Sequence, residues 1–382
     1  MLSLFSFFYY LLTLFIYILA IPYLLYKTRN KKYKEAIPAK FFLKNNNSFE
    51  KSSIWFHVCS MGEAKAIKPL VESLDETNIS VITNTGFEEA KSLSTNVRYL
   101  PFEIFLPFWI NRQKALVVME AELWYFLFLF AKKRGAKTYL INARISDKSY
   151  NSYKRFSFFY KKVFANIDKI FAQTQEDKER LLELGAKEVE VIGNIKLAQL
   201  PKVTKEFTKP DETLITAGST HEKEEELILN SYKREFGKLV IVPRHPERFE
   251  KVAKLLADYA KRNSLSFHRF SKQEDFSSDI ILVDKLGELN NIYAISDIVI
   301  LGGAFANVGG HNPVEPAYFG CKLISGKRIF NQKSLFECVK NYKIIEDDEL
   351  KQTLENIKNI ERSSLVQKGD IKPILKELNG IR

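Results

Sequence analysis

Cysteine is scarce in this chain of 382 residues, which contains only Cys59, Cys321 and Cys338. The three are odd in number, far apart and without the C-x-x-C or Cys/His spacing of a metal site, so neither a disulfide framework nor a zinc site is indicated. The soluble part is therefore expected in a reducing compartment. Repeats of fixed period are also lacking, which excludes a solenoid.

Acidic residues are outnumbered, with 46 Asp and Glu against 58 Lys and Arg, a formal net charge of +12. A basic excess of this size points to nucleic acid, an anionic membrane face or a phosphorylated substrate. The sequence lacks a basic helix or an aromatic-basic motif, so we expect no nucleic-acid partner.

Charged side chains are absent from Leu2 to Tyr26, a run rich in Leu, Phe, Ile and Tyr. Such a helix is long enough to cross a hydrocarbon core of about 30 Å. The positive-inside rule then places the rest of the chain in the cytoplasm, beside anionic lipid. We expect an uncleaved anchor over residues 1–27; a cleaved signal peptide and a helix that lies in the interface are the alternatives. The basic residues that follow are Lys27, Arg29, Lys31, Lys32 and Lys34.

Short apolar segments alternate with helix-like or turn-rich segments after residue 53, a pattern typical of doubly wound parallel sheets. The chain is long enough for about two such domains. We predict an α/β fold of two Rossmann-like halves facing a ligand cleft: anchor 1–27, first half 28–199, linker 200–211 and second half 212–382, whose last helices could pack back on the first. The candidate strands are 54–58, 79–83, 115–119, 137–141, 169–172 and 188–192, then 213–217, 239–242, 280–282, 297–301 and 322–324.

Residues 297–316 read as a buried strand, a double-glycine turn and a helix start. Asn312 is predicted as the N-cap and Pro313 as the first helical residue, so that free N–H groups face an anion such as a nucleotide phosphate. Glu315 has two interpretations. It either bonds back to Asn312 as a capping-box carboxylate or binds the two hydroxyls of a ribose.

Carboxylates follow two of the first-half strands. Glu63 is expected in the first turn of a helix, where it either complements the helix dipole or acts as a general base that the helix N-terminus keeps ionised. Glu120 and Glu122 would point apart if a helix begins at once, so at most one is expected to face the cleft.

Histidines and an arginine gather after strands as well. Four of the five histidines, all except His268, fall in segments that follow predicted strands. Arg244 is either a phosphate ligand, through its planar bidentate fork, or a surface residue in a turn bounded by prolines.

Taken together, the ordered motifs resemble the 3-deoxy-D-manno-octulosonic acid (Kdo) transferases of lipopolysaccharide synthesis. The resemblance runs from the anchor to about residue 330. The motifs are His57-x-x-Ser-x-Gly-Glu63, Glu120-x-Glu-Leu-Trp124, Asn142-Ala-Arg-x-Ser146, Gly193-Asn-x-Lys196, Ser219-Thr-His-Glu222, Pro243-Arg-His-Pro-Glu-Arg-Phe249, Gly287-Glu-Leu289 and Gly302-Gly…Gly309-Gly-His-Asn-Pro-x-Glu315.

This resemblance implies a GT-B glycosyltransferase of the cell inner membrane that transfers Kdo, with inversion, from CMP-Kdo to a lipid A precursor without a metal or other cofactor. It implies that Glu63 is the general base and that Glu120 and Lys196 support the transition state. The CMP contacts that it implies are Pro243, Arg244, Leu286, Gly287, Glu288, Asn312, Pro313, Val314 and Glu315.

The chain departs from the family pattern at three positions. Leu286 replaces a methionine, Tyr125 replaces a proline, and Ala198 replaces an aspartate that would support Lys196. Two other classes remain open: another GT-B nucleotide-sugar transferase or epimerase, and a non-catalytic membrane-bound sugar or lipid binder. The first would not be expected to combine an anchor with the His57–Glu63 segment, and the second would lose the base or the CMP ligands.

Overall fold

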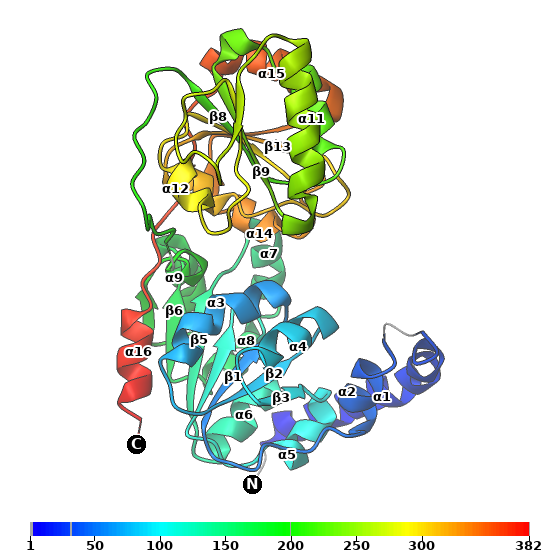
Figure 1. The fold of residues 1–382 in the computed structure, drawn as a ribbon. Coiled ribbons are helices and arrows are strands. Elements are labelled where there is room, and N and C mark those ends of the chain that lie inside the picture. Colours follow the sequence, from blue (N-terminus) through cyan, green and yellow to red (C-terminus); the bar gives the residue numbers. More distant parts are fainter. Residues whose placement is uncertain (1–2, 31–32, 199, 382) are drawn as a thin grey trace. The chain divides into compact units, whose positions relative to one another are not determined.

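The computed structural model describes residues 3–30, 33–198 and 200–381 (Figure 1). Lys31 and Lys32 of the predicted basic flank lie outside the described residues. The chain forms two compact units: unit 1 comprises residues 1–199 and 368–382, and unit 2 comprises residues 200–367.

Unit 1 is built on a seven-stranded sheet in the order β3-β2-β1-β4-β5-β6-β7. All neighbouring strands run parallel, and β1 and β4 are buried along their whole length. A parallel sheet needs helices on both faces, and two apolar clusters fill the layers between them. The strands are β1 (Ile54–Val58), β2 (Thr77–Val81), β3 (Asn96–Tyr99), β4 (Ala115–Met119), β5 (Lys137–Ala143), β6 (Lys169–Ala172) and β7 (Val189–Val191).

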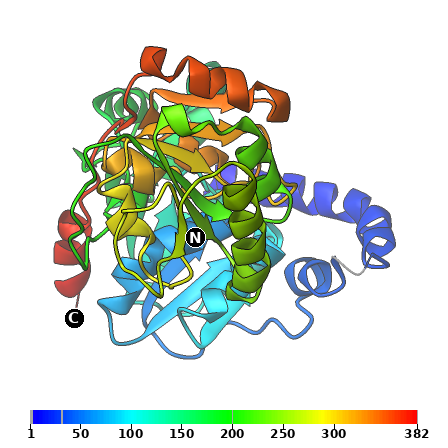
Figure 2. The ribbon, with the colours of Figure 1, turned by 45° about the horizontal axis from the view of Figure 1, so that its top comes forward.

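The helices of unit 1 include two N-terminal ones, α1 (Leu4–Lys27) and α2 (Ala36–Phe42), which lie side by side (Figures 1 and 2). The helices between the strands are α3 (Met61–Glu72), α4 (Asn84–Lys91), α5 (Leu106–Trp109), α6 (Tyr125–Lys133), α7 (Asp147–Arg155), α8 (Ser157–Phe164) and α9 (Gln175–Glu183), with short 3-10 turns η2 (Glu103–Phe105) and η3 (Ile195–Leu197).

Unit 2 has a second parallel sheet of seven strands, in the order β10-β11-β9-β8-β12-β13-β15. Its strands are β8 (Leu214–Thr220), β9 (Lys238–Pro243), β10 (Phe267–Arg269), β11 (Ile280–Leu282), β12 (Ile298–Leu301), β13 (Lys322–Gly326) and β15 (Tyr342–Ile345), beside a small antiparallel pair, β14 (Val339–Lys340) and β16 (Ser364–Leu365). Its helices are α10 (Glu224–Ser231), α11 (Phe249–Arg262), α12 (Leu289–Tyr293), α13 (Val314–Tyr318), α14 (Lys333–Phe336) and α15 (Leu350–Glu355).

The predicted fold of two Rossmann-like halves, the GT-B class, is confirmed. The predicted strands all exist, although β2 begins two residues earlier than expected. The prediction missed the small pair β14 and β16 and, in the two large sheets, β3, β10 and β15, which all lie at sheet edges. The edge strand β3 alternates between buried and half-buried positions, and β10 is half-buried throughout. Such strands lack the continuous apolar run that marks central parallel strands.

The chain returns to unit 1 at its end. Helix α16 (Lys372–Asn379), red in Figure 1, buries Ile374 and Leu378 in the unit 1 core beside Tyr139 and Phe171. The segment 200–211, predicted as a linker, is fastened to unit 2. There the side-chain oxygen of Asn291 accepts the N–H groups of Thr204 and Lys205.

Helix α1 is the one helix in the described part of the chain that is long and apolar enough to cross a membrane. One of its faces packs on unit 1. Ser6 Oγ lies 2.8 Å from the Tyr125 hydroxyl, Tyr9 donates to Glu103 at 2.5 Å, and Tyr17 donates to the carbonyl of Phe41 at 2.5 Å. The remaining faces leave bulky apolar side chains exposed, among them Leu4, Phe8, Phe15, Leu19 and Tyr26.

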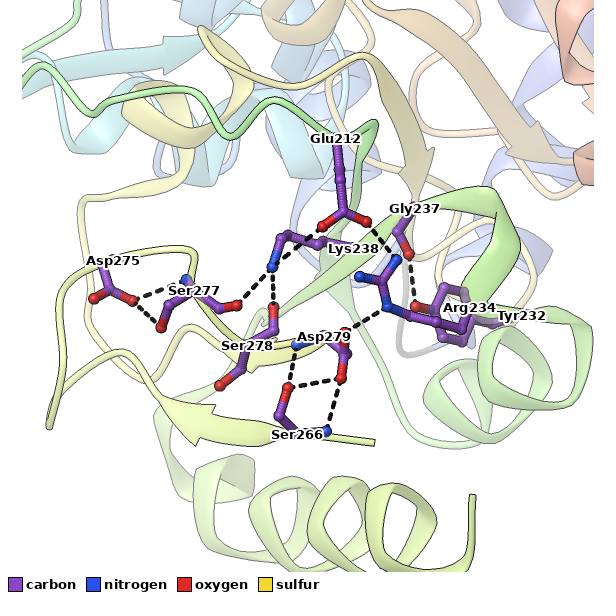
Figure 3. A network of polar contacts seen from close by, with 10 residues as sticks. All are labelled: Glu212, Tyr232, Arg234, Gly237, Lys238, Ser266, Asp275, Ser277, Ser278 and Asp279. Carbon is purple, nitrogen blue, oxygen red and sulfur yellow. Dashed lines mark hydrogen bonds and ion pairs between the residues drawn. The ribbon is translucent and has the colours of Figure 1, made fainter. Parts of the chain in front are cut away.

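A polar network closes the amino-terminal edge of the unit 2 sheet (Figure 3). Arg234 pairs with Glu212 at 2.6 Å and with Asp279, which precedes β11. Lys238, the first residue of β9, lies 3.7 Å from Glu212 and also donates to the carbonyl of Ser277. Arg234 and Lys238 therefore each have a carboxylate within ion-pair distance.

Candidate active site

Glu63 lies in the first turn of α3, immediately after β1, and its side chain is buried. Ser60 is the N-cap. One Glu63 oxygen accepts the N–H of Cys59 at 2.8 Å, and the other accepts the Ser60 hydroxyl at 2.9 Å. The helix-terminal geometry is as expected, but the pKa of Glu63 shifts upward, whereas a helix N-terminus alone would lower it. Burial raises the pKa of Glu63, with smaller contributions from nearby Glu120 and Glu122, against the hydrogen bonds that lower it.

Glu120 and Glu122 both contribute to the raised pKa of Glu63. The prediction that the two point apart held only if a helix begins at once, and none does. The physical reason is the backbone. Residues 120–124 form a turn before α6 begins at Tyr125, and Glu120 adopts the left-handed conformation with φ 57°. The two side chains are therefore not separated by helical spacing.

Lys196 pairs with Glu120 at 2.6 Å, and its side chain is only 10% exposed. The Gly-Asn-x-Lys motif builds this contact. Gly193 has φ 79° and faces the carbonyl of Lys368 so closely that a Cβ would lie 1.7 Å from it. Asn194 caps η3 by accepting the N–H of Lys196 at 3.0 Å. Glu120 supplies the support for Lys196 that the aspartate replaced by Ala198 was expected to give.

Asn142 and Glu122 are positioning residues that the list of predicted site residues omitted. Asn142, fully buried near the end of β5, donates to Glu120 at 3.4 Å and accepts the N–H of Ile195 at 3.0 Å. Glu122 accepts the Trp124 indole N–H at 2.6 Å and lies 3.9 Å from His57 Nε2. Burial favours a raised pKa for Glu122, but these partners outweigh it and lower the pKa. Both residues fall in sequence motifs that follow predicted strands. This position was the signal by which sequence analysis could have found them.

In unit 2 the predicted nucleotide contacts follow neighbouring strands. Pro243 ends β9 and Arg244 follows it, while the segments 286–288 and 302–315 come after β11 and β12. Strand β8 lies between β9 and β12. In a parallel sheet, carboxyl ends share one edge, where α/β proteins bind ligands. Glu315 and Arg244 interact electrostatically at this edge.

Asn312 and Glu315 differ in detail from the capping prediction. Helix α13 begins at Val314, with Pro313 at the cap position. Asn312 still accepts the N–H of Val314 at 3.0 Å, and its amide donates to Glu315 at 3.1 Å. The contact joins two side chains, so the reciprocal capping box is wrong, because Glu315 does not reach the backbone of Asn312. Burial raises the pKa of Glu315 against the Asn312 hydrogen bond and the Arg244 charge.

In the segment 286–288, which was predicted to contact CMP, the backbone is more accessible to a ligand than the Glu288 side chain. Leu286 is exposed and Gly287 has φ 90°. The Glu288 carboxylate is buried and accepts the amide of Asn291 at 2.8 Å. Glu288 also lies 3.6 Å from Lys285, and it helps to orient Asn291, whose side chain binds residues 204 and 205.

Glu224, absent from the predicted site, shapes the glycine loop after β12. Its buried carboxylate accepts the N–H groups of Gly303 at 2.8 Å, Phe305 at 3.0 Å and Ala306 at 2.9 Å, and that of His221 at 2.8 Å. Burial raises its pKa against these four bonds. A carboxylate two residues after the predicted Ser-Thr-His-Glu motif gave no sign of this long-range role.

Three of the strand-end histidines meet beside Arg244. His221 Nε2 lies 2.8 Å from His311 Nε2, and the His245 ring lies edge-on to His221 with centroids 5.2 Å apart. Burial, helped by the neighbouring cations, lowers the pKa of His221 and lowers that of His311 to about 4. The pair is therefore neutral at pH 7, with one ring donating to the other.

Comparisons with known proteins identify the family of the chain. The family described as "3-Deoxy-D-manno-octulosonic-acid transferase (kdotransferase)" matches residues 29–199. A 3-deoxy-D-manno-octulosonic acid transferase of Haemophilus influenzae is 33% identical over 345 residues, which cover 82% of this chain and 79% of the relative. The chain belongs to this Kdo transferase family. The family resemblance is thus confirmed, and by family the chain is a glycosyltransferase.

The Kdo transferase chain is also similar to two further proteins. A bifunctional glycosyltransferase/methyltransferase of Fusobacterium nucleatum is 35% identical over 344 residues, or 81% of this chain, which spans about half (53%) of that relative. A crystal structure of the C-terminal CMP-Kdo binding domain of WaaA from Acinetobacter baumannii is 30% identical, with a TM-score of 0.32, and covers 38% of this chain and 78% of that one.

Proposed function

We propose that this protein transfers Kdo from CMP-Kdo to a hydroxyl of a lipid A precursor, with inversion at the anomeric carbon. Unit 1 is proposed to bind the acceptor and unit 2 the donor. The observation that carries the proposal is Glu63, a buried carboxylate after a parallel strand whose raised pKa suits a general base near neutral pH. Nearby Glu122 has a lowered pKa, and such divergence between neighbouring carboxyls is typical of acid–base sites.

The proposed step is a direct displacement. Glu63 takes the proton of the acceptor hydroxyl as its oxygen bonds to the anomeric carbon of Kdo. The bond from that carbon to the phosphate oxygen breaks, and CMP leaves with the electron pair. Arg244 compensates the charge on the departing phosphate, and the Lys196–Glu120 pair supports the transition state. Glu315 holds the ribose hydroxyls through the carboxylate oxygen that makes no hydrogen bond with any described residue.

We also propose that α1 holds the protein on the cytoplasmic face of the inner membrane by lying in the interface. The contacts of Ser6, Tyr9 and Tyr17 fasten about 17 Å of α1 to unit 1, a length that follows from 1.5 Å per residue. A spanning helix would have to give up these contacts. The exposed apolar face of α1, with Lys27, Arg29 and Lys34 close by in sequence, suits an anionic membrane surface.

The test is acceptor-dependent release of CMP by the detergent-solubilised full chain, from CMP-Kdo generated in situ and a tetra-acylated lipid A precursor. Glu63→Gln should lower turnover by about 10²- to 10⁴-fold, with CMP affinity unchanged. Glu72→Gln, an exposed carboxylate at the other end of α3, is the matched control and should keep full turnover. Glu315→Gln should weaken CMP binding instead.

Normal turnover in Glu63→Gln would sink the assignment of the base. No acceptor-dependent release by the folded wild-type protein would exclude the proposed reaction itself. The mass of the lipid product would count the Kdo residues added.

A further inference from the structure

A cavity of about 830 Å³ opens at the amino-terminal edge of the unit 1 sheet. Ser52 precedes β1, Lys114 precedes β4 and Lys137 begins β5, and all three line the cavity. The carboxylates of the candidate active site lie at the opposite, carboxyl ends of these strands. The volume falls within the range of about 300–1,000 Å³ that small-molecule sites occupy.

The lining of the cavity is cationic. Arg112, Lys114, Lys137 and Lys376 come from three separate stretches of chain, the last of them α16. Among the residues that the structure describes, no carboxylate lies within ion-pair distance of these four. Glu377, the one carboxylate in the lining, is engaged by Lys169 at 2.9 Å and by the Tyr139 hydroxyl at 3.4 Å.

The equivalent edge of unit 2 provides an internal comparison. There Arg234 and Lys238 are matched by Glu212 and Asp279 (Figure 3). At the part of the unit 2 edge formed by β9 and β11, the cations are therefore compensated, unlike the four in the unit 1 cavity. The four cations in the cavity lining are exposed, and an anion bound among them would offset the repulsion between their like charges.

Gln113 is a buried polar residue in the cavity lining that lacks one hydrogen-bond partner among the described residues. Its side chain lines the cavity and is 2% exposed. Its Oε1 accepts the N–H of Ser53 at 3.1 Å and the amide of Asn78 at 2.8 Å, which fixes the orientation of the amide. Its Nε2 is enclosed and has no hydrogen-bond partner among the described residues. A buried donor without a partner costs stability and calls for an acceptor.

We propose that this cavity is a second anion site, which binds a phosphate-bearing ligand of at least two negative charges, separately from the donor site in unit 2. Lysine ammonium groups act as point charges toward phosphate, and Arg112 adds a bidentate fork. The phosphate can come from a free ligand or from a lipid headgroup. Because Lys376 lies on α16, the return of the chain to unit 1 completes the site.

The experiment is calorimetric titration of the detergent-solubilised full chain with pyrophosphate, in the presence of saturating CMP to occupy the proposed donor site. The variant is Lys114→Gln with Lys376→Gln. The matched control is Lys254→Gln with Lys261→Gln on α11, two exposed lysines without an ion pair among the described residues. A parallel arm measures flotation with phosphatidylglycerol and with phosphatidylcholine vesicles.

We expect pyrophosphate to bind the variant at least tenfold more weakly than the wild type and the control. If pyrophosphate does not bind but only the variant loses its preference for phosphatidylglycerol, the anion is a lipid headgroup. Equal pyrophosphate affinity in variant and control would overturn the proposal. Absence of both pyrophosphate binding and a variant-specific vesicle effect would overturn it as well.

Discussion

At the scale of single residues, two carboxylates of the candidate active site differ in whether a cation lies beside them. Glu120 is paired by Lys196, whereas Glu63 has only dipolar partners, the N–H of Cys59 and the hydroxyl of Ser60. A general base is most effective when its pKa lies near the working pH. The pKa of Glu63 is therefore raised by burial, and no cation among the described residues pairs with Glu63 to lower it.

Removing either member of the Lys196–Glu120 pair should move the acid limb of the pH–rate profile in opposite directions. Activity requires ionised Glu63, so it is lost as pH falls through the pKa of Glu63. Glu120→Gln removes a like charge and lowers that pKa, so the limb should shift to lower pH. Lys196→Gln leaves Glu120 uncompensated, and the limb should shift to higher pH. The measurement is kcat/KM against pH.

Glu72→Gln serves as the control for these two variants, because its exposed carboxylate should leave the limb in place. Both active-site variants should also lose turnover if the pair supports the transition state, so the position of the limb, rather than the rate, is the diagnostic readout. Shifts of the same sign in both variants would contradict this electrostatic account of Glu63.

At the scale of elements, the glycine loop after β12 owes its shape to Glu224. Glu224→Ala would leave three loop N–H groups without their acceptor, which should cost about 3 kcal/mol or more of unfolding free energy. We expect faster amide exchange at residues 303–306 and weaker CMP binding, measured by hydrogen-exchange mass spectrometry and calorimetry. Glu226→Ala, exposed on the same helix, should change neither. Unchanged exchange in Glu224→Ala would show that the loop holds its shape without this carboxylate.

The contact between α1 and η2 should depend on pH. Burial, against the hydrogen bonds from Tyr9 and Phe126, raises the pKa of Glu103 from its ordinary value of 4.5 to about 6. A raised pKa in the folded state means that stability is greatest below pH 4.5 and is lost as pH rises through about 6, by about 2 kcal/mol. Glu103→Gln should abolish this dependence. All three tryptophans lie in unit 1, so tryptophan fluorescence during thermal unfolding follows it.

A pH dependence that persists in Glu103→Gln would assign it to another group. The readout separates the titration of Glu103 from general acid effects, because the wild type and the variant differ in one titratable group only.

Sequence could predict the elements that carry a local pattern of apolar residues or a helix-start signal. The central strands and the strand-end position of Glu63 came from continuous apolar runs and helix-start signals. The edge strand β3 and the turn at residues 120–124 did not, because neither is marked by a local pattern. The raised pKa of Glu63 and the role of Glu224 depend on burial and on partners up to 82 residues away, which spacing along the chain does not encode.

At the scale of the whole molecule, the relation between α1 and unit 1 decides how the protein meets a membrane. A spanning helix and an interfacial helix have the same length and hydropathy, so composition left both open. The contacts that Ser6 and Tyr17 make with the rest of unit 1 support the proposed interfacial placement, because these polar groups bond to protein and would not face lipid.

The interfacial placement predicts that both ends of α1 lie on one side of the membrane. Single variants Ser3→Cys and Thr28→Cys flank the helix, and in sealed inside-out vesicles a membrane-impermeant maleimide should label both, above the background of the parent chain. Labelling of Thr28→Cys alone, with Ser3→Cys reacting only after detergent is added, would mean that α1 crosses the bilayer and releases unit 1. In that case Tyr9→Phe should leave unit 1 stability unchanged, whereas docking predicts a loss of about 1 kcal/mol from the missing hydrogen bond to Glu103.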